Sequence, residues 1–168
     1  MKTLYMVRHA KSSWDDMSLS DHDRPLNGRG EKNAPEMGRR LKDRGILPDL
    51  LISSSAVRAY ETARKIAKEI GYLENRIANS KNLYHADEED IIRWLQEQED
   101  KNNSLMIFGH NPGFTECVNL LSGAGFYNIP TCGVVAMAFE TELWSEVKAG
   151  TGTLIFYDYP KKPWSSKT

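Results

Sequence analysis

Basic side chains stand together where a short apolar run near the N-terminus ends. The run at residues 3–7, TLYMV, leads directly into Arg8 and His9, and Lys11 follows two residues later. A buried strand normally ends in turn residues rather than in adjacent cationic groups. The chain therefore either reaches solvent at this point or meets a negatively charged group there.

Two later apolar runs end in residues of a similar kind. Residues 48–55, PDLLISSS, are followed by Arg58, and residues 104–110, SLMIFGH, end at His110. Ligands of open α/β sheets bind beyond the carboxyl ends of the strands, so we expect these side chains at one sheet edge. Each of them alone has an ordinary explanation as a surface charge or a capped residue, and the three serines as helix caps. Two histidines and two arginines from distant segments together favour a functional site.

Two imidazoles and two guanidiniums suit a phosphoryl group. Arginine side chains bind phosphate oxygens in pairs and keep their charge at physiological pH. A neutral imidazole nitrogen can attack phosphorus and carry it as a covalent phosphohistidine, and neighbouring arginines favour the neutral imidazole. The four histidines show no HxH or HExxH spacing, and the sequence has no GxxxxGK[ST] or GxGxxG motif. The residues thus predict phosphotransfer without a cofactor or a metal ion.

Strand and helix patterns alternate along the chain and predict an α/β fold. Apolar runs of strand length occur at residues 3–9, 48–55, 77–83, 104–110, 133–140, 143–147 and 152–160. Helical patterns lie between the first of these runs, at residues 27–45, 56–70, 87–98 and 111–123. This order predicts a three-layer α/β/α sandwich with a mostly parallel central sheet, which the last strands close as hairpins.

Local signals refine the first part of this arrangement. Asn27 and Asp87 are predicted helix N-caps, while Pro35 predicts a kink or a restart within the first helix. The polar loop before Asn27 is too long for a simple connection. Its acidic part at residues 15–25 is either a solvated loop or a rim that selects substrate. In the second case Arg24 would contact a partner or pair with an acidic neighbour.

Composition and charge limit the class of protein. The chain has 168 residues, with 22 Lys and Arg against 23 Asp and Glu, so no overall basic charge attracts nucleic acid or a membrane surface. No apolar run approaches the roughly 18 residues of a membrane span, and no signal-peptide pattern is present. Cys117 and Cys132 are isolated, which argues against a disulfide framework. We predict a cytoplasmic protein with one domain over residues 1–160 and a polar tail over 161–168; its oligomeric state stays open.

The strand-end motifs resemble those of a known family. "VRHA", "SSSAVRAYETA" and "GHNPG", in this order, are similar to the motifs of the histidine phosphatase superfamily, which has the phosphoglycerate-mutase-like fold. The fuller pattern "RHAKSSW…DHDRPLNGRG" resembles the small SixA-type branch, the phosphohistidine phosphatases. The resemblance extends from Tyr5 to about Gly123.

This resemblance implies a role for each residue at the strand ends. His9 would be the nucleophile, phosphorylated transiently and then hydrolysed. Arg8, Arg58 and His110 would hold the phosphoryl oxygens and stabilise the charge that develops on them. Asn27 would either add a polar contact to this pocket or serve only as a helix cap.

The sequence departs from the family pattern at the general acid. Many members carry an acidic residue directly after the second histidine, but here Asn111 occupies that position. Other members carry the acid near position 87, where Asp87, Glu88 and His85 are the candidates, and Asp87 has an alternative role as a cap. An alkoxide leaves poorly without a proton donor, whereas an imidazole leaves easily. A weak or missing acid therefore favours a phosphorus–nitrogen bond or an activated ester in the substrate.

These observations predict a cofactor-independent phosphatase that forms a transient phosphohistidine on His9. The substrate would be a phosphorylated protein or a small phosphorylated molecule, with protein phosphohistidine favoured. Two alternatives are a general small-molecule phosphomonoesterase and a phosphate-recognition module without turnover. Turnover that is lost in His9→Ala would separate the enzymes from the module.

Overall fold

A six-stranded sheet forms the centre of the computed structural model, which describes residues 1–164. Its order is β3-β2-β4-β1-β5-β6. The strands are β1 (Lys2–Arg8), β2 (Leu50–Ser54), β3 (Ala78–Ser80), β4 (Ser104–Gly109), β5 (Val134–Phe139) and β6 (Gly152–Asp158). The helices are α1 (Gly28–Asp43), α2 (Val57–Ile70), α3 (Glu88–Gln96) and α4 (Gly113–Ser122). The polar tail predicted over 161–168 lies outside the described residues from 165 onward.

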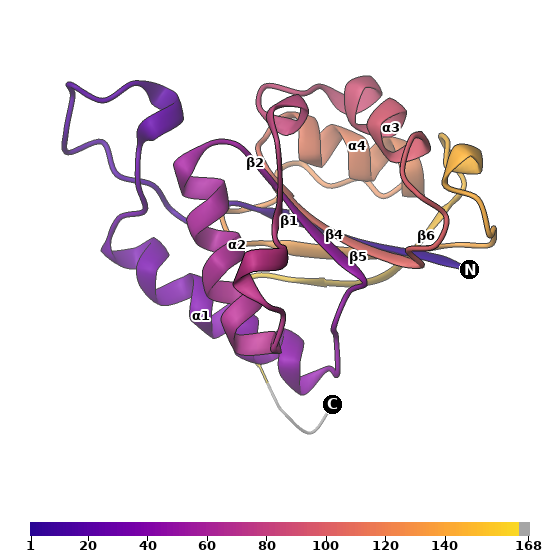
Figure 1. Ribbon diagram of the computed structural model, residues 1–168, viewed down its shortest axis with the longest axis horizontal. Coiled ribbons are helices and arrows are strands. Elements are labelled where there is room, and N and C mark those ends of the chain that lie inside the picture. Colours follow the sequence, from indigo (N-terminus) through magenta and orange to yellow (C-terminus); the bar gives the residue numbers. More distant parts are fainter. Residues whose placement is uncertain (165–168) are drawn as a thin grey trace.

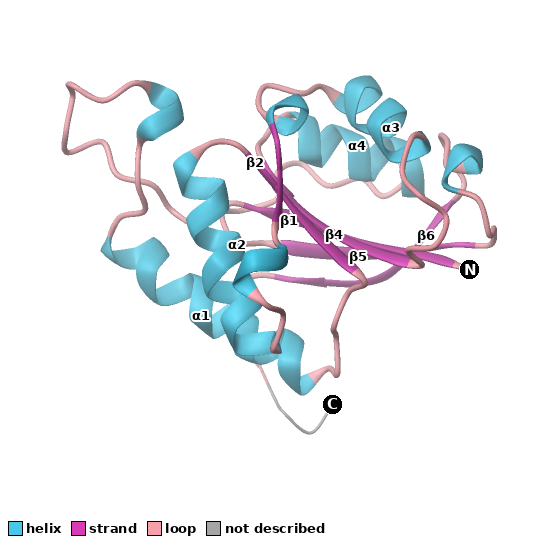
Figure 2. Cartoon of the chain, in the orientation of Figure 1, coloured by secondary structure: helices cyan, strands magenta, loops and turns pink. Residues whose placement is uncertain are grey.

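Strand directions and helix positions confirm the predicted sandwich. The pairs β1–β4, β2–β4 and β2–β3 are parallel, while β5 runs antiparallel to both β1 and β6. Helices α1 and α2 cover one face of the sheet, and α3 and α4 cover the other (Figures 1 and 2). The architecture is therefore a three-layer α/β/α sandwich with a mostly parallel sheet, as in the phosphoglycerate-mutase-like fold.

Each face of the sheet has its own apolar core. Leu4 and Met6 of β1 belong to the cluster beneath α3 and α4, which also contains Phe114. Val7 of the same strand belongs to the cluster beneath α1 and α2, together with Ile66. Successive side chains of a strand point to opposite faces, so a strand buried on both faces reads as a continuous apolar run. This explains why the apolar runs in the sequence predicted the central strands well.

Two expectations from the sequence are wrong. Residues 143–147 form no strand; Trp144–Glu146 is a short 3₁₀ helix whose fully buried Trp144 donates its indole N–H to the Asn102 carbonyl at 2.7 Å. The backbone N–H of Trp144 bonds the Asp100 carboxylate rather than a neighbouring strand, at 2.8 Å. The restart predicted at Pro35 does not occur either, because α1 is one unbroken helix of 16 residues that contains Pro35.

Close packing against α2 explains why α1 continues through its proline. A proline inside a helix removes one backbone hydrogen bond, a cost that burial can offset. Ala34, Met37 and Leu41 bury the inner face of α1. A Cβ atom at Gly38 would lie 2.8 Å from the Cβ atom of Glu69 on α2, so the two helices approach each other at the glycine. Tertiary contacts thus outweigh the local signal of Pro35.

The described helices include none that is long and apolar enough to cross a membrane. Cys117 and Cys132 are both buried and unpaired as a disulfide. Burial raises the pKa of the Cys132 thiol to about 12, so this cysteine stays a neutral thiol at ordinary pH.

A buried ion pair connects α1 to the edge strand β6. Arg40 Nη1 donates to Asp158 Oδ1 at 2.9 Å, and the two side chains are only 6% and 3% exposed. Removing one member of such a pair leaves a buried charge, which costs about 3–5 kcal/mol. We expect Asp158→Ala to lower the free energy of unfolding by about 3 kcal/mol, measured by denaturant unfolding. Glu99→Ala, which removes an exposed pair with Lys101, serves as the control and should change it by under about 1 kcal/mol.

Candidate active site

Three neighbouring parallel strands deliver the predicted residues to one edge of the sheet. β1 pairs with β4 so that Arg8 lies opposite Gly109, and the residues that follow are His9 and His110. The His9 backbone N–H donates to the Gly109 carbonyl at 3.0 Å, which holds the two strand ends together. The imidazole rings of His9 and His110 lie 5.2 Å apart, centre to centre. The structure thus brings together the two histidines that are a hundred residues apart in sequence.

The His9 ring is fixed in one orientation. Its Nδ1 lies 2.7 Å from the Ala10 carbonyl oxygen. A carbonyl can only accept a hydrogen bond, so Nδ1 carries the proton and donates it. Nε2 then has a free lone pair, and it makes no hydrogen bond to any residue within 1–164. This is the arrangement that a nucleophilic nitrogen requires.

The environment of His9 keeps its imidazole neutral. Burial and the nearby charges of Arg58 and Arg8 lower its pKa to about 3, although the hydrogen bond to the Ala10 carbonyl opposes this shift. The arginines were predicted to have this effect, but burial is the largest cause. Burial and the proximity of His9 likewise lower the pKa of His110 to about 3. Both imidazoles are therefore neutral at physiological pH.

Both predicted arginines lie beside the histidines. Arg58, on the first turn of α2, is buried, and Arg8, at the end of β1, is half-buried, which lowers the pKa of Arg8. Arg8 Nη1 donates to the Ile129 carbonyl at 2.9 Å. The Nε atoms of both arginines and Nδ1 of His110 are buried and have no hydrogen-bond partner among the described residues. Their unpaired nitrogens suit an anion with several acceptor oxygens.

Asp21 is a member of the site that sequence reasoning placed only on a loop rim. Its Oδ2 accepts from Arg58 Nη2 at 3.1 Å and from the Tyr84 hydroxyl at 2.7 Å. Its Oδ1 accepts from Arg24 Nη2 at 3.2 Å, so Arg24 does pair with an acidic neighbour. These bonds, the one from Tyr84 first, hold the pKa of Asp21 below its usual range. The carboxylate is thus ionised and partly neutralises Arg58.

The loop that carries Asp21 projects from the molecule between β1 and α1 (Figure 1). Its base is closed by a bridge between Ser12 and Leu26 and by hydrogen bonds from Arg24 to Ser12 and Ser13. The sequence contained no signal that singled out Asp21, because several neighbouring aspartates in the acidic run had the same local pattern.

Two of the other predicted site residues, Asn27 and Asp87, are helix caps. Asn27 caps α1, its side chain accepting from the Gly30 backbone N–H at 2.9 Å. Asp87 caps α3 in a capping box with Asp90.

A cavity of about 360 Å³ beside His110 is lined by His85, Asp87 and Glu88 together with Asp21 and Arg58. The three acid candidates therefore share a cavity with His110, and the carboxylate of Asp87 is engaged in helix capping.

The serine run does not cap α2, as one interpretation of the sequence suggested. Ala56 is the N-cap residue and has no side-chain capping bond. Ser54 Oγ lies 2.7 Å from His110 Nε2, and Ser55 Oγ lies 2.9 Å from His22 Nε2. These serines therefore contact ring nitrogens from other segments. The sequence contained no signal for this, because serines before a helix usually cap it.

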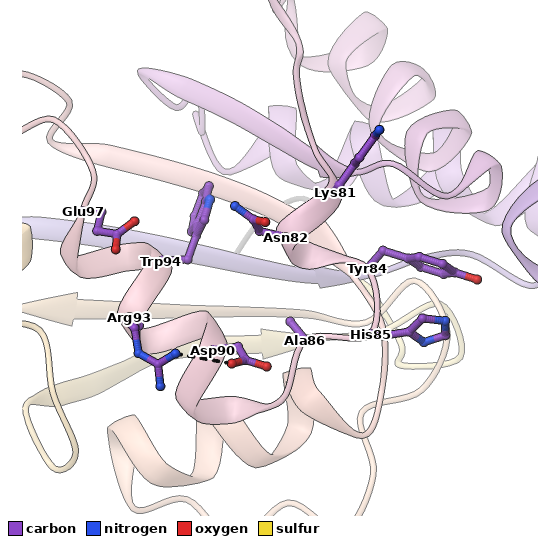
Figure 3. Close-up of a pocket in the computed structure, with 9 residues that line it drawn as sticks. All are labelled: Lys81, Asn82, Tyr84, His85, Ala86, Asp90, Arg93, Trp94 and Glu97. Carbon is purple, nitrogen blue, oxygen red and sulfur yellow. Dashed lines mark ion pairs between the residues drawn. The ribbon is translucent and has the colours of Figure 1, made fainter.

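A second cavity continues from the first along α3. It has a volume of about 400 Å³ and shares His85 and Ala86 with the first cavity. Figure 3 shows the segment that holds Tyr84 and His85 on one side and the α3 side chains, among them Trp94, on the other. Within residues 1–164, no cluster of three or more His, Cys, Asp or Glu side chains could hold a metal ion.

Known proteins resemble this chain in sequence. The profile of the histidine phosphatase superfamily (branch 1) matches residues 4–84. An uncharacterized chloroplast protein of Arabidopsis thaliana is 34% identical over 159 residues, which cover 90% of this chain and 72% of that protein. The chain belongs to the histidine phosphatase superfamily. An uncharacterized protein of Mycobacterium tuberculosis is 25% identical over 165 residues, covering 92% of this chain and all of that protein.

Solved structures of the superfamily share the fold. A crystal structure of SixA from Agrobacterium tumefaciens has a TM-score of 0.81 and 25% identity, covering 95% of this chain and 98% of that one. The protein histidine phosphatase SixA in complex with tungstate has a TM-score of 0.79 and 19% identity, covering 94% and 97%. With its membership of the superfamily, the chain is a phosphatase, a hydrolase of phosphorylated substrates.

The low pKa values of the two site histidines predict how stability depends on pH. In the unfolded chain these imidazoles protonate near pH 6.5, whereas in the folded protein His9 and His110 stay neutral down to about pH 3. Stability therefore falls as the pH drops from about 6.5 toward 3, by about 1.4 kcal/mol per pH unit for each histidine. We expect His110→Gln to reduce the slope of unfolding free energy against pH by about 1.4 kcal/mol per pH unit between pH 4 and 6, measured by urea unfolding. An unchanged slope would mean that His110 titrates in the folded protein.

The carboxylate of Asp21 competes with a bound anion for Arg58. We expect Asp21→Asn to lower the dissociation constant of inorganic phosphate about fivefold, the scale of an exposed charge interaction, measured by titration calorimetry at pH 7. Asp16→Asn is the matched control, because Asp16 lies in the same loop but its carboxylate bonds only Ser18 among the described residues. Weaker phosphate binding by Asp21→Asn would show instead that Asp21 is needed to hold Arg58 in place.

Proposed function

We propose that this phosphatase removes the phosphoryl group from phosphohistidine in proteins through a covalent intermediate on His9. The geometry of His9 carries this proposal: its Nδ1–H is bonded to the Ala10 carbonyl, its Nε2 is free, and its ring lies 5.2 Å from that of a second neutral histidine, within the electrostatic influence of Arg58 and Arg8. A neutral nucleophile and fixed positive charges are the two requirements for transfer of a phosphoryl group to nitrogen.

The reaction has two chemical steps. In the first, the lone pair of His9 Nε2 forms a bond to phosphorus while the bond from phosphorus to the substrate imidazole breaks, and the departing imidazole takes up a proton from solvent. In the second, a water oxygen attacks the phosphorus and the bond to Nε2 breaks, the water gives up a proton to solvent, and inorganic phosphate leaves. Arg8 and Arg58 balance the charge on the phosphoryl oxygens in both steps, since guanidiniums keep their charge even when buried.

The acidic groups of the site favour a good leaving group. Asp21 is ionised, because its pKa is held below the usual range, and so it has no proton to give. Asp87 accepts the backbone N–H of Asp90 at 2.8 Å as a helix cap. Glu88 and His85 line the neighbouring cavity and, unlike Asp87, do not serve as the N-cap of α3. An imidazole leaves without a strong acid, since its conjugate acid has a pKa of about 6.5.

Similar proteins support this choice of substrate. The SixA structure bound to tungstate is described as a protein histidine phosphatase, and it shares this chain's fold. Tungstate is an oxyanion of the same shape as phosphate. A shared fold at 19% sequence identity supports the proposal only by analogy. The chemical argument comes from the residues around His9.

A second candidate is a phosphatase of small phosphate monoesters. The cavity of about 360 Å³ beside His110 favours it, because that volume can hold a small molecule and the three acid candidates line it. On this alternative Glu88 or His85 would protonate an alkoxide leaving group.

Parallel assays of phosphate release separate the candidates. We expect rapid release from a phosphohistidine peptide, at least about 100-fold faster than from the phosphoserine peptide of the same sequence, because only the latter needs a strong general acid. His9→Ala should abolish release from both, and a rapid quench of the wild type in alkaline denaturant, in which phosphohistidine is stable, should trap phosphate on His9. Comparable rates on both peptides would favour the monoesterase, whereas activity retained by His9→Ala would refute the covalent mechanism.

A further inference from the structure

Ser54 links β2 to the second histidine of the pocket. It is the last residue of β2, and its side chain is fully buried. Its Oγ lies 2.7 Å from Nε2 of His110, which follows the adjacent strand β4. The same Oγ lies 3.3 Å from the backbone nitrogen of Ala56. Two nitrogens thus share one hydroxyl group at the edge of the pocket.

The direction of these hydrogen bonds follows from counting hydrogens. The Ala56 backbone N–H can only donate, so Ser54 Oγ accepts that bond. The hydroxyl has one hydrogen of its own, and His110 Nε2 is its acceptor among the described residues. If Nε2 carried a hydrogen instead, the hydroxyl hydrogen would be buried without an acceptor, which is unfavourable. With Nε2 as the acceptor, one group, the Nδ1–H of His110, lacks a partner among the described residues. With Nε2 as the donor, two groups lack one, the hydroxyl hydrogen and the Nδ1 lone pair, so the first arrangement is favoured and Nε2 is the acceptor.

The remaining nitrogen of His110 then carries the proton. A neutral imidazole has one N–H group, so an accepting Nε2 requires a protonated Nδ1. Nδ1 is buried and has no hydrogen-bond partner within residues 1–164. The ring lies 5.2 Å from the His9 ring, centre to centre. A phosphoryl oxygen would be repelled by a lone pair at Nδ1, whereas an N–H there attracts it.

We infer that Ser54 is a positioning residue: it fixes His110 in the Nδ1–H tautomer, so that His110 offers a hydrogen-bond donor to the phosphoryl group on His9. The catalytic part of this inference rests on the proposed function, while the tautomer is a property of the resting protein. His110 keeps its proton throughout, and no bond to hydrogen needs to break at this residue. Ser54 acts only through His110 and does not touch the phosphoryl group.

Nitrogen NMR tests the tautomer directly. In a ¹⁵N-labelled protein at pH 7, long-range proton–nitrogen spectra distinguish a protonated from an unprotonated ring nitrogen, and the signals absent from His110→Gln assign this residue. We expect a protonated Nδ1 and an unprotonated Nε2 in the wild type. In Ser54→Ala the proton should move to Nε2 in part or all of the population, because the hydroxyl that donates to Nε2 is gone.

Kinetics test the consequence for the reaction. We expect Ser54→Ala to lower kcat on the phosphohistidine peptide by at least about tenfold, as for loss of a donor to a charged transition state, with a smaller change in KM. Ser54→Thr keeps the hydroxyl and should restore both kcat and the wild-type tautomer. Ser53→Ala is the matched control, because the neighbouring Ser53 is equally buried but donates to the Ser54 carbonyl instead, at 2.8 Å.

The outcomes separate this inference from the proposed function. A proton on Nε2 of His110 in the wild type would overturn the inference, and so would a Ser54→Ala variant with unchanged tautomer and kcat. Absence of turnover by the wild type would refute the proposed function but leave the spectra to decide the tautomer. If Ser54→Ala fails to fold, as judged by thermal unfolding, the wild-type spectrum alone still confirms or refutes the assignment.

Discussion

The parallel pairing of β1 with β4 places Arg8 opposite Gly109, and the meeting of the two site histidines depends on that register. The two strands end side by side, so the residues that follow them, His9 and His110, have to be neighbours. A shift by one residue would turn the side chains of β1 to the opposite faces of the sheet. Both faces are packed with apolar side chains, which makes such a shift unfavourable and keeps the histidines together.

Burial at this sheet edge gives the pocket its electrostatic character. Removal from water keeps His9 and His110 neutral, while Arg8 and Arg58 remain charged because a guanidinium is not deprotonated in proteins. The result is a pair of uncharged imidazoles beside fixed positive charges. Asp21 reduces that charge locally at Arg58. The site thus contains a neutral nucleophile, His9, beside positive charges that attract anions. The carboxylate of Asp21 limits that attraction at Arg58.

The layers around the sheet position the remaining groups. The close approach of α4 to the segment before α3 is possible because residue 113 is a glycine: a Cβ atom there would lie 2.1 Å from the Ala86 carbonyl oxygen. This contact places the candidates His85 and Glu88 beside His110. On the other side, Arg24 bonds Ser12 at the base of the loop between β1 and α1. Arg24 also bonds Asp21 of the same loop, and Asp21 in turn bonds Arg58. Segments from both faces therefore complete one pocket.

The sequence by itself determined the central strands, the helix caps at Asn27 and Asp87, and the set of four basic residues at strand ends, because these depend on local patterns of burial and capping. It did not determine the continuity of α1 through Pro35 or the 3₁₀ helix at Trp144, where packing outweighs local preference. Only the tertiary structure decided that Asp21 binds Arg58 and Ser54 binds His110. Those contacts join segments that are distant in sequence, and nothing in the residues nearby distinguishes them from a solvated aspartate or a capping serine.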